Sequence, residues 1–155
     1  MMGKKKVYIA YGSNLNMAQM EHRCPLAEFL GVGYLNDWEL IYRGSKTGSY
    51  ATIRPKAGKV VPVGLWKITR FDEKQLDIYE GFPSFYKKQN LSVEFESGEQ
   101  KIGMAYIMDQ NRKVGRPSEY YIDTVYQGYM DCGLDARFLL ESLITNRKEM
   151  KKGRG

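Results

Sequence analysis

The stretch Val7-Tyr8-Ile9-Ala10-Tyr11-Gly12-Ser13-Asn14-Leu15 decides how this chain begins to fold. Its first half is β-branched and aromatic, which is typical of a strand. A glycine then permits a sharp turn and a close approach of the backbone to a ligand. Ser13 and Asn14 are residue types that cap helices, and residues 16–22 can form that helix. Such a turn points backbone N–H groups at one spot, which suits an anion, although a plain chain reversal is the simpler alternative.

Length and composition fit a single globular domain. The chain has 155 residues, of which 43% are apolar and 27% charged, enough to bury a true core. No apolar run approaches the roughly 18 residues needed to cross a bilayer. Lys4 to Lys6 imitate the charged start of a signal peptide, but the apolar run behind them is too short for a secretory core. We therefore expect a cytoplasmic protein that binds no membrane.

Residue types for metal or triad chemistry are scarce. The two cysteines, Cys24 and Cys132, form no C-x-x-C pair, and without a secretory signal they are expected to be reduced and structural. His22 is the only histidine, which leaves little for a His-rich zinc site or a Ser-His-Asp triad. The sequence therefore predicts no metal site and favours chemistry by other side chains.

The formal net charge of +6 is concentrated at the two ends of the chain. Residues 147–155 hold five Lys or Arg against one Glu, and Lys4 to Lys6 add three more positive charges. Residues 7–146 hold 16 Lys or Arg and 17 Asp or Glu. A folded nucleic-acid binder concentrates positive charge on one face of its domain, so this distribution argues against a nucleic-acid partner. We expect one domain over residues 1–146, followed by a basic, frayed tail over residues 147–155.

Runs of β-branched and aromatic residues predict a series of strands after the first. They lie at residues 29–34, 38–42, 50–54, 60–68, 86–95 and 103–108. Asn36-Asp37 predicts a turn between the first two of these, and Pro55 predicts the end of the third. Ser97-Gly98 predicts the turn between the last two. Polar loops are expected over residues 43–49 and 109–116.

Three helical segments complete the predicted domain. Thr69-Arg70-Phe71-Asp72 fits a capping pattern, and the helix over 71–80 that follows ends at a glycine. Pro117-Ser118 opens a helix with an apolar stripe at i, i+3, i+4 and i+7, and residues 136–143 repeat that stripe. These elements predict an α+β domain with a mostly antiparallel sheet or barrel, one central helix and a C-terminal helical pair.

Glu80 is the carboxylate that the sequence singles out. It lies in the last turn of the predicted helix 71–80, where the helix dipole disfavours an anion by roughly 0.3–1 kcal/mol. Its neighbours include Tyr79, Phe82 and Tyr86, so an apolar setting is expected. Both effects raise a carboxyl pKa and make a better proton shuttle near neutral pH. The alternative is a solvated glutamate beside a glycine that ends the helix.

Two motifs in order resemble the γ-glutamylcyclotransferase family and its AIG2-like relatives. Tyr11-Gly12-Ser13-Asn14-Leu15 follows the first strand, and Leu76-Asp77-x-x-Glu80-Gly81 with a later tyrosine lies downstream. Further segments resemble family landmarks in the right order: Arg23-Cys24-Pro25, Tyr50-Ala51-Thr52-Ile53, Val63-Gly64-Leu65-Trp66, Pro117-Ser118 and Gly133-Leu134. The resemblance implies an α+β fold built on a mixed, mostly antiparallel β-barrel flanked by helices, with the active site in a cavity at its mouth.

The resemblance also implies a reaction that needs neither metal nor cofactor. A small-molecule γ-glutamyl amide is cyclised to 5-oxoproline, and the attached amine is released. Glu80 falls at the position of the family's catalytic glutamate, and the loop over residues 11–15 falls where the family holds the glutamyl group. The expected site is a catalytic Glu80 with these substrate-binding residues: Tyr11, Gly12, Ser13, Asn14, Leu15, Tyr86 and Tyr106.

Several alternatives stay open at this level. Tyr86 and Tyr106 either donate a hydroxyl in the pocket or pack as buried strand tyrosines, and Arg54 either balances substrate charge or lies at a sheet edge. The released amine is an amino acid, an alkylamine, a lysine side chain or a biosynthetic intermediate, with the loops over 43–49 and 109–116 as the expected determinants. The oligomeric state is undetermined. A non-catalytic binding module on the same fold is the alternative function, and the intact loop and Glu80 argue against it.

Overall fold

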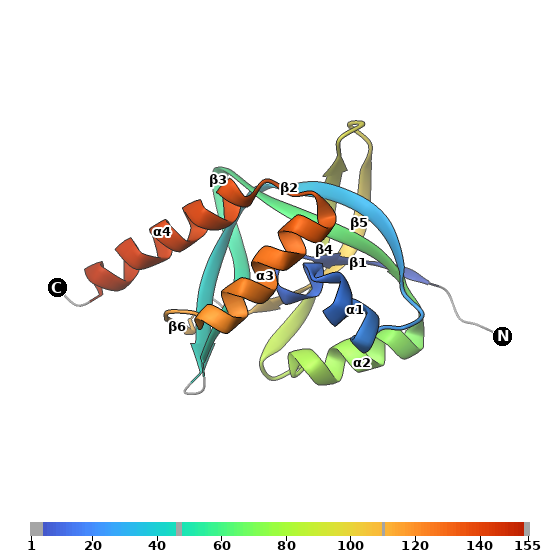
Figure 1. The fold of residues 1–155 in the computed structure, drawn as a ribbon, viewed down its shortest axis with the longest axis horizontal. Helices are drawn as coiled ribbons and strands as arrows, with labels where there is room; N and C mark the ends of the chain where they lie inside the picture. Colours follow the sequence, from blue (N-terminus) through green and yellow to red (C-terminus); the bar gives the residue numbers. More distant parts are fainter. Residues whose placement is uncertain (1–4, 46–47, 110, 154–155) are drawn as a thin grey trace.

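The structure is a computed structural model that describes residues 5–45, 48–109 and 111–153. Its strands are β1 (Lys6–Ala10), β2 (Glu28–Ser45), β3 (Gly48–Ile68), β4 (Tyr86–Phe95), β5 (Gln100–Met108) and β6 (Lys113–Val114). Its helices are the short 3-10 helix η1 (Ser13–Leu15) and the α-helices α1 (Met17–Arg23), α2 (Arg70–Glu80), α3 (Glu119–Cys132) and α4 (Ala136–Lys152) (Figure 1).

Strands β1 to β5 close a mixed barrel, and β6 is a short addition at its edge. The order along the sheet is β3-β1-β5-β4-β2-β6, and a further pairing of β2 with β3 joins the ends of the barrel. β1 and β5 run parallel, whereas the other paired strands run antiparallel. The expected α+β fold, a mixed and mostly antiparallel β-barrel flanked by helices, is therefore confirmed.

β2 and β3 form one long hairpin, so the strands expected over residues 29–68 merge into two. The expected turn at Asn36-Asp37 is wrong, because Asp37 takes a φ of 65° inside β2 and the register shifts there, which is a β-bulge. The Asp37 carboxylate accepts a hydrogen bond from the Gly58 N–H at 2.9 Å, which joins the two strands at this point. The expected strand end at Pro55 is also wrong. Pro55 lies opposite Trp38, beside the bulge, where a missing N–H is tolerated.

α2 ends at Glu80 as predicted and begins one residue earlier than predicted, at Arg70, and α3 begins directly after Pro117-Ser118 as predicted. The Thr69 hydroxyl accepts a hydrogen bond from the Asp72 N–H at 3.1 Å, and the two residues form a complete capping box. Gly81 ends α2 in the left-handed region with a φ of 67°. Ser118 caps α3, and Gly133 ends it in the same way with a φ of 70°.

α4 is longer than expected, and the prediction of a frayed chain from residue 147 is wrong, since the helix continues to Lys152. Glu149 lies 2.7 Å from Arg43 Nη2 and 3.7 Å from Arg54 Nη1, so these ion pairs tie the last turns of α4 to β2 and β3. Figure 1 shows α4 extending away from the barrel toward the C-terminus. Residues 154–155 of the expected tail lie outside the described residues.

The expected polar loops are partly strand. β2 and β3 extend into the first, and β6 lies in the second. Lys46, Thr47 and Gln110, which also fall in these loops, lie outside the described residues. In the ranges that the structure describes, no helix is both long enough and apolar enough to span a bilayer.

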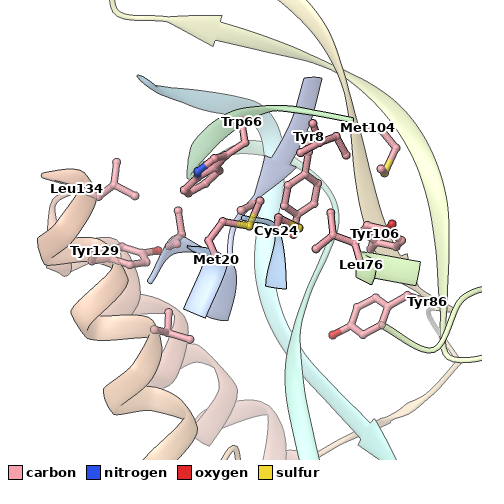
Figure 2. Close-up of a cluster of buried hydrophobic side chains, with 14 of the residues drawn as sticks. Tyr8, Met20, Cys24, Trp66, Leu76, Tyr86, Met104, Tyr106, Tyr129 and Leu134 are labelled. Carbon is pink, nitrogen blue, oxygen red and sulfur yellow. The ribbon is translucent and has the colours of Figure 1, made fainter. Parts of the chain in front are cut away.

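One buried cluster fixes the helices against the barrel (Figure 2). It includes Tyr8 of β1, Met20 of α1, Leu76 of α2 and Tyr129 of α3. Leu76 is fully buried, so α2 is anchored one turn before its C-terminal residue. Cys24 lies in the same cluster as a free thiol, as expected of a reduced structural cysteine.

Candidate active site

A cavity of about 360 Å³ lies among β1, the loop after it, β3, β4, β5, α2 and α3. It is lined by seven of the expected site residues: Tyr11, Gly12, Ser13, Asn14, Glu80, Tyr86 and Tyr106. The loop and the glutamate, distant in the chain, therefore meet in one cavity, as predicted. Leu15 does not line it. Its side chain is fully buried in the core, because η1 is a single turn that directs this apolar residue between Gly64 and Gly128.

The loop after β1 carries backbone N–H groups beside the cavity that donate to no described residue. Gly12 is the N-cap of η1, and no side chain caps this helix. Among the described residues, none accepts a hydrogen bond from the N–H of Gly12, Ser13 or Asn14. A side chain at Gly12 would be crowded, because a Cβ would lie 3.1 Å from Tyr121 Oη and 3.3 Å from Ala51 Cβ.

The side chain of Asn14 contacts neighbours through both its nitrogen and its oxygen. Its Nδ2 donates to Tyr8 Oη at 2.9 Å, and its Oδ1 accepts a hydrogen bond from Arg23. The Arg23 guanidinium in turn stacks 3.4 Å from the centroid of the Tyr79 ring. Tyr79 Oη shares a hydrogen bond of 3.3 Å with Ser13 Oγ. This chain of contacts holds the loop in place, with the backbone N–H of Asn14 accepted by no described residue.

Glu80 is the last residue of α2 and the carboxylate of the cavity wall. Burial raises its pKa from 4.5 to about 7, although the nearby positive charge of Arg23 opposes part of this rise. The direction is the one that the sequence predicts. No hydrogen bond from another described residue holds the carboxylate. A carboxylate with a pKa near neutrality and no protein partner can take a proton from a ligand and return it.

The hydroxyls of the three tyrosines expected in the site already donate hydrogen bonds to protein acceptors. Tyr11 donates to the carbonyl oxygen of Tyr106. Tyr86 donates to the carbonyl oxygen of Ala51 at 2.8 Å, and Tyr106 donates to Asp77 Oδ1 at 2.6 Å. Tyr86 and Tyr106 thus line the cavity and are also strand tyrosines with satisfied hydroxyls.

Charged side chains hold α2 against the barrel from outside the cavity. Lys88 of β4 lies 2.9 Å from Asp77 Oδ1 and 2.7 Å from Glu73 Oε2. Lys6 of β1 lies 3.1 Å from the same Glu73 oxygen. Together with the bond from Tyr106 to Asp77, these contacts fix the helix that ends in Glu80.

Part of the cavity wall lies outside the set expected from the sequence. These further residues line it: Tyr8, Ile9, Tyr50, Ala51, Ile78, Tyr79, Gly81, Phe85 and Tyr121. Tyr121 carried a usable signal, a tyrosine in the first turn of the helix that Pro117-Ser118 opens. Arg54 is not among the residues that line the cavity. It forms an ion pair of 2.8 Å with Glu39, which fits the expected alternative of an arginine at a sheet edge.

The arrangement suits proton transfer on a small polar ligand. Tyrosine hydroxyls and backbone N–H groups surround one carboxylate, and no lysine or arginine is among the residues that line the cavity. Within the described part of the chain, no three His, Cys, Asp or Glu side chains gather into a group that could hold a metal ion. The groups that the wall offers are thus a base of suitable pKa and neutral hydrogen-bond donors.

Comparisons with known proteins agree on one family. The family model described as gamma-glutamyl cyclotransferase, AIG2-like, matches residues 8–124. The gamma-glutamylcyclotransferase of Homo sapiens is 31% identical over 140 residues, which are 85% of this chain and 74% of the human protein. That of Bos taurus is 30% identical over 144 residues, 88% of this chain and 76% of the bovine protein. A solved gamma-glutamyl cyclotransferase structure superposes with a TM-score of 0.82 at 28% identity, covering 90% of this chain and 86% of that one.

Proposed function

This chain belongs to the gamma-glutamyl cyclotransferase, AIG2-like family of enzymes, and from that premise we propose that it cyclises a γ-glutamyl amide to 5-oxoproline with release of the attached amine. One observation carries the proposal. Glu80, with a pKa near 7 and no described hydrogen-bond partner, shares a cavity with the free N–H groups of residues 12–14. We further propose that residues 1–146 form the catalytic domain.

The nucleophile is the substrate's own α-amine in its neutral form. Its nitrogen attacks the γ-carbonyl carbon, a new C–N bond closes the five-membered ring, and the carbonyl electron pair moves onto oxygen. Attack within one molecule can reach effective molarities on the order of 10⁵–10⁸ M when the geometry is right. The protein therefore has to fold the glutamyl chain back on itself, move one proton and stabilise one negative charge.

Glu80 moves the proton. Its carboxylate takes a proton from the attacking nitrogen as the ring closes, and the resulting carboxylic acid then protonates the departing nitrogen. The oxyanion collapses, the C–N bond to the leaving group breaks, and neutral amine is released with the carboxylate restored. A pKa of about 7 suits both halves of this cycle, because a shuttle works best when its pKa lies near the working pH.

The loop after β1 holds the negative charge. The N–H groups of Gly12, Ser13 and Asn14 are donors for the substrate α-carboxylate or for the oxyanion that develops on the γ-carbonyl oxygen. Removal of one oxyanion donor typically lowers the rate by about 10²–10³. The contacts among Arg23, Asn14 and Tyr8 set the loop in advance, so little reorganisation is needed when the substrate binds.

The test is a panel of γ-glutamyl amino acids, γ-glutamyl alkylamines and ε-(γ-glutamyl)-lysine, with 5-oxoproline measured by mass spectrometry. We expect turnover of at least one class, and kcat/KM should rise with pH through about 7 as Glu80 ionises. Glu80→Gln should keep the fold and abolish 5-oxoproline formation, since the amide cannot accept the proton. Binding of these compounds without any product would support a non-catalytic module, and substantial turnover by Glu80→Gln would remove Glu80 as the base.

A further inference from the structure

We propose that Tyr121 is a further catalytic residue of this cavity, whose phenolic O–H donates a hydrogen bond to the γ-carbonyl oxygen of the substrate. The inference rests on the proposed function, and it concerns a residue that the sequence did not place in the site. It follows from asking which tyrosine hydroxyls of the cavity can still donate a hydrogen bond to a ligand.

A phenol carries one proton and can donate one hydrogen bond. Three cavity tyrosines have used theirs on protein acceptors: Tyr11 on a carbonyl, Tyr86 on a carbonyl and Tyr106 on a carboxylate. Their hydroxyls cannot also donate to a substrate without breaking these bonds. Of the four other cavity tyrosines, Tyr79 shares a hydrogen bond with Ser13 Oγ, and the hydroxyls of Tyr8, Tyr50 and Tyr121 have no acceptor among the described residues.

Tyr121 is different because its oxygen acts as an acceptor. The Ala51 N–H donates to Tyr121 Oη at 3.1 Å. No described residue accepts a hydrogen bond from this hydroxyl, which lies in the cavity wall. The proton of a phenol lies in the ring plane on one of two sides, and the Ala51 N–H occupies one of them. The O–H of Tyr121 is therefore available on the other side.

The hydroxyl of Tyr121 lies next to the loop after β1. A Cβ on Gly12 would lie only 3.1 Å from Tyr121 Oη, so this oxygen lies directly beside the backbone of the loop. Tyr121 also lies in the first turn of α3, where its N–H donates to Ser118 Oγ at 3.1 Å. The Tyr50 ring meets it edge to face, with centroids 5.3 Å apart. The side chain is thus held firmly beside the free N–H groups.

Burial keeps Tyr121 a neutral donor. It raises the phenol pKa well above its ordinary value, and the nearby Glu80 carboxylate adds to the rise. The hydroxyl therefore retains its proton over the working pH range. A donor held beside the loop strengthens its bond as negative charge develops on the γ-carbonyl oxygen, so it should act more on kcat than on KM.

Tyr8 is the alternative donor, because its oxygen also accepts, from Asn14 Nδ2 at 2.9 Å, whereas the Tyr50 hydroxyl lies beside Gly48, 3.3 Å from where a Cβ would be. Its hydroxyl belongs to the chain of contacts that runs from Arg23 through Asn14. Tyr121 instead adjoins Gly12 itself, which favours it as the residue that completes the oxyanion site. The experiment separates the two.

The experiment compares Tyr121→Phe with Tyr8→Phe and with Tyr129→Phe in the full chain, on the best γ-glutamyl substrate of the wild-type protein. Tyr129 is the matched control, because it lies on α3, outside the cavity, and its buried hydroxyl has no hydrogen-bond partner among the described residues. Tyr121→Phe should lower kcat by about 10²–10³ with little change in KM, and Tyr129→Phe should keep the wild-type kcat. An unchanged kcat in Tyr121→Phe, a rise in KM alone, or a kcat loss confined to Tyr8→Phe would overturn the proposal.

Gly12→Ala alone still tests the proposal should Tyr121→Phe fail to fold, as judged by circular dichroism, because an unchanged kcat in Gly12→Ala would refute the assignment. The added methyl group displaces the Tyr121 hydroxyl without removing it, so kcat should fall, and the fall should be smaller in a Tyr121→Phe background that folds. Equal losses in both backgrounds, or no loss in either, would refute the assignment. A wild-type protein that forms no 5-oxoproline from any panel compound would refute the proposed function, and this inference with it. Turnover that is insensitive to Tyr121 would refute this inference alone.

Discussion

Replacing Glu80 with Gln should stabilise the fold above pH 7 while it removes turnover. The pKa of Glu80 is about 7 in the folded protein and 4.5 as its ordinary value. Between these pH values the folded state keeps a proton that the unfolded chain has released, so the free energy of unfolding falls as pH rises. The contribution of protonated Glu80 to the free energy of unfolding is fully present below pH 4.5 and is lost as pH rises through about 7.

The size of this effect follows from the shift itself. A rise from 4.5 to about 7 corresponds to about 3 kcal/mol, because one pKa unit is worth about 1.4 kcal/mol. Gln is neutral at every pH and avoids this loss. For a chain of 155 residues, 1 kcal/mol moves the melting temperature by about 2–4 °C. The melting temperature of Glu80→Gln minus that of the wild type should therefore be about 6–12 °C larger at pH 8.5 than at pH 4.

The assay is thermal unfolding followed by circular dichroism from pH 4 to 8.5, with urea unfolding for the free energies, for the wild type, Glu80→Gln and a control. Glu141→Gln is the control, because Glu141 is an exposed carboxylate on α4, and its difference from wild type should stay within about 0.5 kcal/mol. A difference between wild type and Glu80→Gln that stays constant over this range would refute the reasoning. The carboxyl of Glu80 would then have its ordinary affinity for a proton, and the case for it as a shuttle at neutral pH would fall.

Two further predictions concern the frame around the site. A Cβ on Gly128 would lie 2.6 Å from backbone atoms of Leu15 and Asn16, so Gly128→Ala should lower stability by about 1–3 kcal/mol in denaturant unfolding. An unchanged midpoint would contradict the packing of α3 on η1. Deletion of residues 148–155 should lower stability, because Arg43 loses Glu149, yet leave kcat nearly unchanged, because none of the described residues of this segment, 148–153, lines the cavity. A large loss of kcat would instead show that the end of α4 acts on the cavity.

Local signals made the helices predictable. The capping box that begins α2 and the glycine that ends it act within a few residues of chain, so the sequence defined both ends of the helix that carries Glu80. The bulge at Asp37 was not predictable in this way. A left-handed residue serves a reversing turn or a bulge equally well, and only the pairing of β2 with β3 decides between them.

The cavity residues likewise include some that local motifs predicted and some features that only the tertiary structure shows. The family motifs placed residues 11–14 and Glu80 together, and the structure brings them to one cavity. Leu15 was misassigned because a motif shows neighbours in sequence and not which side chain turns toward the core. The use of each phenolic proton was equally hidden, since it depends on acceptors such as Asp77, which come from other strands and helices. Those acceptors decide whether a tyrosine can still donate to a ligand.

Tyr106 connects the two parts of the site, the loop after β1 and the end of α2 that carries Glu80. Its carbonyl oxygen accepts from Tyr11, at the start of the loop, and its hydroxyl donates to Asp77, one turn before Glu80. One residue of β5 therefore links the groups proposed to hold the substrate with the group proposed to move its proton. A half-buried carboxylate without a described partner, at the end of a helix, opposes folding by about 3 kcal/mol above pH 7, and such a site needs rigid support from its surroundings. The hydroxyls of Tyr11, Tyr86 and Tyr106, each bonded to a protein acceptor, supply that support, and the substrate contacts proposed above fall to Tyr121 and the backbone of the loop.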